Sequence, residues 1–415
     1  MRLRLSSLSW FVAVFLLPAA VHAQSGPAAG IAFHSNRDGN NNIYVMNADG
    51  SAQAPLTLDP ANDQRAEIAP DGSHVVFAST RSGGHFEIFV MNSDGSDVRQ
   101  LTFTGAAVTN TWPRWSPDGA WIAFQSNASG AFQIVAVRPD GTDLRQITNT
   151  GVNQFPAWSP DGTRLAVRRD VDIYLVDASD GSNAVRLTTA APLNQMPSWS
   201  PDGTQIAFMS TREPGGYPSV FVMNADGTAQ RDLTPKCDAM ADPKCPVPTS
   251  PWSSRAPAWS PNGAYIYFTG IRPGLPTEQI YVMRADGSEP EALTSAGVNA
   301  EATVRHVRPP VVTSVAATPN VLWPPNNQMV NVSVNVGASD DSDPAPTCRI
   351  IGVSSNEPAA GTDWSISGAL TLDLLARRLG EGTGRVYTLT VACTNTSELT
   401  SMATVTVTVP HDQRK

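Results

Sequence analysis

Carboxylates recur at a regular spacing in this chain, and carboxylate oxygens are ligands that hard cations such as calcium prefer. They occupy two kinds of turn, one close to Trp-Ser-Pro-Asp-Gly and one close to Ala-Asp-Gly. The first kind has its acidic or amide residue at Asp71, Asp118, Asp161, Asp202 and Asn262, and the second at Asp49, Asp94, Asp140, Asp180, Asp226 and Asp286. An aspartate in such a turn also bonds its own backbone, so we interpret these residues as turn formers rather than metal ligands.

The acidic run Asp340, Asp341 and Asp343 is a better calcium candidate, because three oxygen donors fall within four residues of a predicted loop. The run lacks the glycine and the distal glutamate of an EF-hand loop. A solvated turn is therefore the favoured interpretation, and calcium stays an open alternative. No other cofactor is predicted.

Four tryptophans stand at the same point of successive copies of the first turn, namely Trp115, Trp158, Trp199 and Trp259. Such a row could stack on sugar rings, but one tryptophan per copy is more typical of packing between neighbouring structural units. The sequence has no Gly-x-Ser-x-Gly elbow, no His-Glu-x-x-His motif and no glycine-rich phosphate loop. We therefore predict a protein that is not an enzyme.

The turns recur because the chain is built from repeats. The Ala-Asp-Gly-type turn appears six times, and short alternating apolar runs flank both kinds of turn. This pattern predicts four antiparallel strands per repeat, as in one blade of a β-propeller. The first repeat, from Ile31, lacks its innermost strand, and the segment 300–307 matches that strand. We expect this segment to pair with the N-terminal strands, which would close a six-bladed ring without an open edge.

The motif Trp-Ser-Pro-Asp-Gly, as at Trp115–Gly119, followed by an Ile-Ala-Phe-like strand and by a segment such as Ile43–Gly50, resembles the WD40-like (PD40) repeat of the TolB propeller family. The resemblance covers about residues 31–307. It implies an all-β protein with a TolB-like six-bladed β-propeller over residues 24–310. TolB itself carries an α/β domain before its propeller, whereas the repeats here start close to the predicted mature N-terminus, so the resemblance concerns the propeller alone.

The two ends of the chain differ from the repeats. Residues 1–23 contain Arg2 and Arg4, an apolar run and a small-residue cleavage point at Ala23, the layout of a secretory signal peptide. Residues 311–415 alternate apolar and polar residues in several runs, which predicts a small β-sandwich. That tail resembles the immunoglobulin-like modules at the ends of bacterial exported proteins.

Four cysteines follow the signal, and an even count in an oxidising compartment predicts two disulfides. Pairing by neighbourhood joins Cys237 with Cys245 in an insertion of the last repeat. It also joins Cys348 with Cys393, which we expect to bridge the two sheets of the sandwich.

The charge of the predicted mature chain restricts its partners. Without Arg2 and Arg4, 26 basic residues remain against 37 acidic ones, a net charge of −11, and no basic cluster appears. Nucleic acid is therefore excluded as a partner. After the signal, no apolar run is long enough for stable membrane insertion. We expect a monomer that is periplasmic or secreted.

The binding site is predicted at one mouth of the propeller channel, where the innermost strands present their side chains. The residues just ahead of the turns are Gln64, Arg65, Trp112, Gln154, Phe155, Gln195, Arg255 and Glu301. This mixture suits a peptide or a protein of the cell envelope, so we predict an exported non-catalytic binding or scaffold protein. The alternative is a propeller enzyme, a lyase or hydrolase acting on a carbohydrate or peptide at the same mouth.

Overall fold

The computed structural model describes residues 30–189, 192–212, 216–234, 253–272, 275–305, 307, 309–340, 343, 345–358, 363–378, 384–396 and 399–411. These residues form strands and turns, and none of them is helical. Accordingly, this part of the chain holds no helix that could cross a membrane. The predicted signal peptide and the predicted Cys237–Cys245 pair lie outside the described residues.

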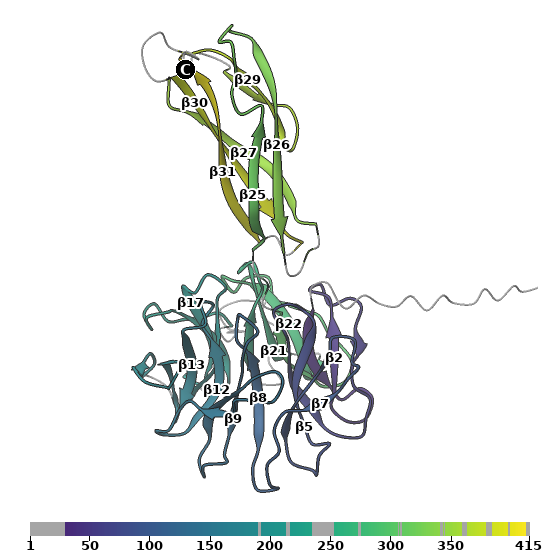
Figure 1. Cartoon of the computed structure of the whole chain (residues 1–415). Coiled ribbons are helices and arrows are strands. Elements are labelled where there is room, and N and C mark those ends of the chain that lie inside the picture. The colour runs from purple at the N-terminus through teal and green to yellow at the C-terminus, as the bar shows by residue number, and fades with distance from the viewer. Residues whose placement is uncertain are drawn as a thin grey trace, which may run out of the picture.

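Residues 31–304 form six four-stranded antiparallel sheets in the described part of the chain, arranged around a common axis as in a propeller (Figure 1). We call these sheets the sheet ring. The first sheet contains β1 (Ile31–Ser35), β2 (Asn42–Met46), β3 (Ala54–Pro55) and β24 (Asn299–Val304). The second contains β4 (Asp63–Ile68), β5 (His74–Ser79), β6 (Glu87–Asn92) and β7 (Arg99–Gln100). The third contains β8 (Asn110–Trp115), β9 (Ile122–Ser126), β10 (Gln133–Val137) and β11 (Arg145–Gln146).

The other three sheets of the ring repeat this order. The fourth contains β12 (Asn153–Trp158), β13 (Arg164–Arg169), β14 (Asp172–Asp177) and β15 (Val185–Arg186). The fifth contains β16 (Asn194–Trp199), β17 (Gln205–Ser210), β18 (Ser219–Asn224) and β19 (Arg231–Asp232). The sixth contains β20 (Ser253–Trp259), β21 (Tyr265–Arg272), β22 (Leu275–Arg284) and β23 (Glu291–Ala292).

The two ends of the sheet ring meet in the first sheet. Strand β24 pairs antiparallel with β1, with Val304 opposite Ile31 and Asn299 opposite Ser35. The pairing expected for the closing segment is therefore confirmed. It leaves no unpaired strand edge on the axis side of β1, which protects the ring from edge-to-edge association.

The turn aspartates bond their own turns, as the sequence predicted. In one turn of each kind, Asp118 accepts the backbone N–H of Ala120 at 3.0 Å, and Asp94 accepts that of Ser96 at 2.9 Å. The following glycine of the second turn is required by both conformation and space, because Gly95 has a φ of +86° and a Cβ there would lie 2.7 Å from the carbonyl oxygen of Leu56.

The tryptophans pack between neighbouring sheets, which confirms their predicted structural role. Trp115 is 4 % exposed and belongs to one buried cluster with Val76 and Leu101 of the preceding sheet. Its indole N–H donates to the carbonyl of Glu67 at 3.3 Å, and that of Trp158 donates to Arg114 at 3.2 Å. Trp115 and Trp158 therefore each join their own innermost strand to the preceding one.

The described residues between 311 and 410 form two further sheets, and we call this part the C-terminal module. One sheet contains β25 (Val311–Thr318), β26 (Met329–Ser339), β29 (Thr371–Leu375) and β28 (Trp364–Ile366), and the other β27 (Thr347–Ser355), β30 (Gly384–Thr394) and β31 (Thr400–Pro410). Their buried side chains form one core that includes Val332, Leu372 and Tyr387. The module stands on one face of the sheet ring (Figure 1).

The predicted disulfide Cys348–Cys393 is present, but its expected position was wrong. Cys348 on β27 and Cys393 on β30 lie directly opposite each other on neighbouring strands of one sheet. The bond therefore joins two strands within a sheet instead of bridging the two sheets. Spacing in sequence indicates which cysteines are neighbours but not whether their strands share a sheet.

Candidate functional site

A ring of six residues constricts the axis of the sheet ring, with one residue from each innermost strand. Each has a positive φ, between 51° and 58°, and lies at a register shift in the pairing of its strand. Left-handed backbone is costly for residues other than glycine, and such strain gathers at sites that the surrounding fold over-determines. We call these residues the constriction; they are Arg65, Trp112, Phe155, Met196, Ala256 and Glu301.

The bulges are stabilised by side chains that accept the displaced backbone N–H groups. The N–H of Phe155 donates to Gln125 at 3.0 Å, and that of Glu301 donates to Thr269 at 2.7 Å. A buried backbone donor without a partner would destabilise the fold, so these acceptors favour the bulged conformation. The side chains of the constriction therefore project from fixed positions.

One half of the constriction is apolar. The rings of Trp112 and Phe155 meet edge to face with centroids 4.7 Å apart, and Met196 and Ala256 pack against them. The guanidinium of Arg65 lies 5.1 Å from the centre of the Trp112 ring, a cation–π contact that joins the apolar half to the charged half.

The other half carries a buried charge cluster centred on Glu301. Its carboxylate lies 3.0 Å from Arg255 and 3.3 Å from Arg65, and Arg255 also binds Glu278 at 2.8 Å. Burial by itself would raise the pKa of Glu301, but Arg65, His34 and Arg255 together lower it. Burial lowers the pKa of His34, whose Nδ1 lies 3.8 Å from Glu301.

The structure brings part of the sequence-predicted site together. Arg65, Trp112, Phe155 and Glu301 belong to the constriction, and Arg255 binds Glu301 from the neighbouring strand position. The three predicted glutamines directly precede members of the constriction on their strands, and all are half-buried. Gln195 accepts a hydrogen bond from Arg168 at 2.8 Å. In the strand pairing, Gln64 lies opposite Ala78, and Gln154 lies opposite Arg168. Whether these eight residues bind a ligand stays a prediction.

A cavity of about 710 Å³ opens on the other side of the constriction and faces the C-terminal module. We call it the axial pocket. Trp112, Phe155, Met196, Ala256 and Glu301 contribute to its lining at the constriction. Its wall contains the tryptophans and prolines of the Trp-Ser-Pro-Asp-Gly turns, and its outer border includes Val312, Asp340 and Met402 of the C-terminal module.

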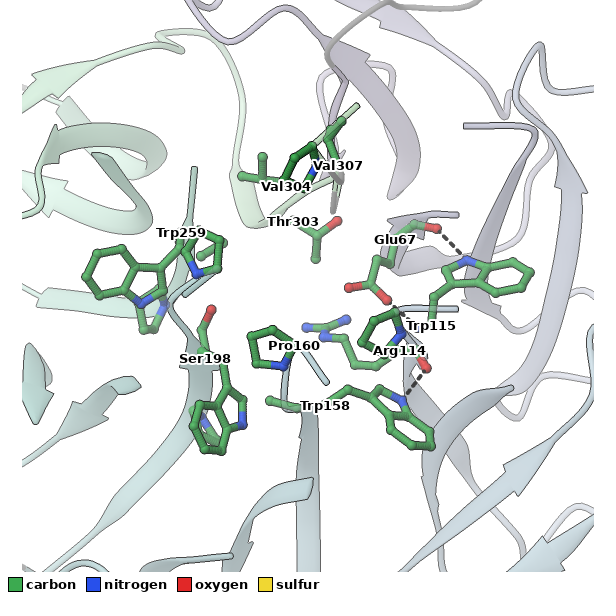
Figure 2. Close-up of a pocket in the computed structure, with 18 of the residues that line it drawn as sticks. Glu67, Arg114, Trp115, Trp158, Pro160, Ser198, Trp259, Thr303, Val304 and Val307 are labelled. Atoms are coloured by element: carbon green, nitrogen blue, oxygen red, sulfur yellow. Dashed lines mark hydrogen bonds between the residues drawn. The ribbon is translucent and has the colours of Figure 1, made fainter. Parts of the chain in front are cut away.

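Two charged side chains project into the axial pocket, Glu67 and Arg114. Figure 2 shows both extending toward the middle of the pocket, with Trp115, Trp158 and Trp259 around its wall. Each lies two residues after a member of the constriction, on the far side of the register shift, and the equivalent residues Ala157, Ser198, Ala258 and Thr303 of the other strands line the same pocket. Neither residue was among the predicted site residues, although aligning the repeats two positions beyond the constriction could have found both.

The carboxyl of Glu67 is a buried acid of the axial pocket with a raised pKa. The residue is 3 % exposed, and one of its carboxylate oxygens accepts the backbone N–H of Trp115. Burial raises the pKa of Glu67 to about 7, against an opposing effect of Arg114 and of that hydrogen bond. A carboxyl with this pKa exchanges a proton near neutral pH, and it can donate or accept a hydrogen bond to a ligand.

Asp340 and Asp343, two of the candidate calcium ligands, accept hydrogen bonds from their own loop and from the loop that follows β30. Asp340 accepts the backbone N–H of Asp343 at 2.8 Å and the side chain of Asn395 at 3.0 Å. Asp343 accepts the N–H groups of Ala345 and Thr396. Asp341 lies outside the described residues, and within the described ranges no group of three His, Cys, Asp or Glu side chains could hold a metal ion.

Comparisons with known proteins place this geometry in a family. The model of the TolB beta propeller domain matches residues 21–170 and 149–250, which together exceed half of the chain. TolB from Acinetobacter baumannii is 21 % identical, with a TM-score of 0.56 over 67 % of this chain and 67 % of that one. A putative TolB from Agrobacterium tumefaciens is also 21 % identical, with a TM-score of 0.50 over 67 % of this chain and 97 % of that one.

An enzyme shares the fold as well. Hydrazine synthase from Kuenenia stuttgartiensis is 13 % identical, with a TM-score of 0.53 over 92 % of this chain and 68 % of that one. At these identities the structural likenesses show the fold alone. No curated protein matches the chain.

Proposed function

The chain belongs to the TolB β-propeller family, and from this premise we propose that it is an exported, non-catalytic binding protein whose axial pocket holds a peptide or a segment of an envelope protein. In this proposal residues 1–23 are a signal peptide, residues 24–310 are a six-bladed propeller and residues 311–415 are an immunoglobulin-like sandwich. The protein acts as a monomer in the periplasm or outside the cell.

The sheet topology supports the proposed architecture. Six four-stranded sheets in the described residues 31–304 correspond to six blades, and the β24–β1 pairing corresponds to their closure. The two sheets of the C-terminal module share one buried core, as the two sheets of a sandwich do. The Cys348–Cys393 disulfide fits an oxidising compartment outside the cytoplasm.

The axial pocket is the observation that carries the proposed function. Its volume of about 710 Å³ lies within the usual range for ligand sites, and its wall combines tryptophan, proline and aliphatic side chains with several polar groups. Glu67 and Arg114 supply an acceptor and a donor side by side, which is what the C=O and N–H groups of a peptide require. Ser198 adds a hydroxyl on the opposite wall.

The proposal is tested by filling the axial pocket. Ser198→Trp places an indole in the cavity, and exposed Ser129→Trp is the matched control because it adds the same side chain far from the pocket lining. Each variant is used in a crosslinking pull-down from the native envelope fraction, followed by mass spectrometry. We expect one partner to be lost with Ser198→Trp and kept with Ser129→Trp, and a synthetic peptide from its crosslinked segment to compete.

A second pair of changes tests the constriction itself. Trp112→Ala combined with Arg255→Ala removes an apolar side chain of the constriction and a cation that binds Glu301. We expect the same binding partner to be lost. A partner list that is identical for wild type, Ser198→Trp and this double variant would refute the axial pocket as the binding site.

Catalysis at the axial pocket is the second candidate function, and one observation favours it. Glu67 has a pKa of about 7, the value that suits a general acid or base near neutral pH. Such an enzyme would be a lyase or hydrolase acting on a carbohydrate or peptide. Turnover of an oligosaccharide or peptide panel by wild type, with loss in Glu67→Gln, would support this candidate over the first.

A further inference from the structure

We call the boundary between two neighbouring sheets of the sheet ring a seam. Comparison of the repeats shows that one seam lacks a tryptophan that most others have. In four innermost strands the last residue is a tryptophan that packs on the preceding sheet, at Trp115, Trp158, Trp199 and Trp259. The equivalent residues of β4 and β24 are Ile68 and Val304. Val304 has the smallest side chain of the six, and it lies where the first and the sixth sheet meet.

A cavity of about 550 Å³ lies at this seam, and we call it the seam pocket. Its lining includes Val304 together with Tyr267, Val282 and Leu293, whose equivalents surround a tryptophan at four other seams. Val282 and Leu293 are half-buried, whereas their counterparts Val90 and Leu101 are covered beside Trp115. The small side chain of Val304 therefore leaves part of this space open.

Tyr267 fills only part of the space. Three of the tryptophans face an alanine of the preceding sheet, namely Ala123, Ala166 and Ala207, and Tyr267 occupies the equivalent position at the seam. Its hydroxyl donates to the carbonyl of Ala48 at 3.3 Å, and burial raises the pKa of Tyr267 to about 12, so the hydroxyl keeps its proton. The tyrosine is thereby held along one wall of the cavity.

The rim of the seam pocket is acidic. Asp49 and Glu291 are exposed carboxylates in its lining, and Asp49 has a lowered pKa because Ser51 donates two hydrogen bonds to it. The only basic side chain among the described lining residues is Arg305, whose guanidinium donates to the carbonyl of Pro70. The rim therefore attracts a positive group beside an apolar slot.

We propose that the seam pocket is a second binding site, separate from the axial pocket, for a planar aromatic ring that carries a positive charge. The ring takes the space that a tryptophan indole occupies at the equivalent seams, and its cation faces Asp49 and Glu291. A free aromatic amine and a tryptophan beside lysine in a peptide share this chemistry. The site does not depend on the function proposed for the axial pocket.

Calorimetry with tryptamine tests the proposal, and indole-3-propionate is the anionic control. We expect saturable tryptamine binding to wild type, and binding of the anion that is at least about tenfold weaker. Asp49→Asn combined with Glu291→Gln should weaken tryptamine binding about fivefold without a change in packing. A lysine–tryptophan–lysine peptide titrated in parallel distinguishes a peptide ligand from a free amine by the tighter of the two affinities.

Val304→Trp fills the slot and should abolish tryptamine binding. Because Tyr267 could clash with the new indole, Tyr267→Ala with Val304→Trp is the second variant, which recreates the Ala–Trp pair of three other seams. Val304 also borders the axial pocket, so Ser198→Trp is the control and should leave tryptamine binding intact. The proposal would be overturned if wild type showed no saturable tryptamine binding. It would also be overturned if Ser198→Trp lost tryptamine binding while the folded Val304 variants kept it.

Discussion

At the scale of the residue, Glu67 is where protonation, packing and the axial pocket meet. Its carboxyl is enclosed by tryptophan and proline side chains, and it fixes the backbone of Trp115 on the next innermost strand. Protonation therefore changes both the charge of the pocket and a contact between two sheets. A ligand that brings its own positive charge would favour the ionised form, and a neutral ligand the protonated form.

Glu67→Gln should remove a pH dependence of stability. Burial raises the pKa of Glu67 from 4.5 to about 7, so the folded state binds the proton more tightly than the unfolded state. This contribution is fully present below about pH 4.5 and is lost as the pH rises through 7, by on the order of 3 kcal/mol. Glutamine keeps an acceptor for Trp115 and does not titrate.

Urea unfolding of wild type and Glu67→Gln at pH 5 and pH 8 measures the effect. We expect the free energy of unfolding of wild type to fall relative to the variant between the two pH values. An equal difference at both pH values would show that Glu67 has an ordinary pKa, and it would remove the support for an acid–base role.

The sequence predicted the constriction in part, because strand position could be counted from each turn. Counting located Arg65, Trp112 and Glu301 at equivalent places. It could not predict that each has a positive φ, since neither tryptophan nor glutamate signals left-handed backbone. Nor could it predict the ion pairs of Arg255 with Glu278 and Glu301, which join residues from different strands.

At the scale of the element, a threonine follows an apolar residue just after the outermost strand of each sheet in the ring, as Thr148 follows Ile147 after β11. This threonine explains why the short outermost strand keeps its register. Its buried hydroxyl accepts the backbone N–H at the start of the third strand, as Thr148 does from Ile134 at 2.8 Å. In the third sheet the same hydroxyl donates to Gln133 at 2.8 Å. The equivalent acceptors of the other sheets are Thr57, Thr102, Thr188, Thr234 and Thr294.

Thr148→Val should destabilise the protein by about 1–3 kcal/mol, because it keeps the shape but leaves the N–H of Ile134 without its acceptor. Exposed Thr189→Val is the matched control, with an expected change within about 0.5 kcal/mol. Urea unfolding of both variants compares them with wild type. Equal stability of the two variants would mean that water or a backbone shift replaces the buried bond.

The positions of the strands were predicted well where turns separate them in the sequence. Their partners were predicted poorly where only the pairing of strands determines the sheet. The repeated Asp-Gly turns located the strands of each sheet, and the match of residues 300–307 to an innermost strand located β24. In the C-terminal module alternation located strands but not their partners. The disulfide was therefore assigned to the wrong pair of elements, since Cys348 and Cys393 share a sheet.

At the scale of the whole molecule, closure joins the two ends of the sheet ring through more than backbone pairing. Strand β24 contributes Glu301, which pairs with Arg65 of the second sheet and Arg255 of the sixth. It also contributes Thr303, which donates to the carbonyl of Ala66 at 2.6 Å. The closing strand therefore completes the constriction, the axial pocket and the seam pocket together.

Truncation before and after the closing strand tests this dependence. A chain of residues 24–310 retains β24, and we expect a monomer that unfolds cooperatively. A chain of residues 24–297 lacks β24, so the edge of β1 is open and Arg65 and Arg255 lose the carboxylate of Glu301. Removing one partner from a buried ion pair costs about 3–5 kcal/mol, and the open edge adds a site for association.

Size-exclusion chromatography and thermal unfolding distinguish the two chains. We expect residues 24–297 to aggregate or to lack a cooperative transition, while residues 24–310 behave as a folded monomer. Adding a peptide of residues 298–310 should restore cooperative unfolding to the shorter chain, because it supplies the strand, Glu301 and Thr303 together. If the shorter chain is already monomeric and as stable as the longer one, the ring does not depend on β24 for closure, and neither pocket needs the strand to form.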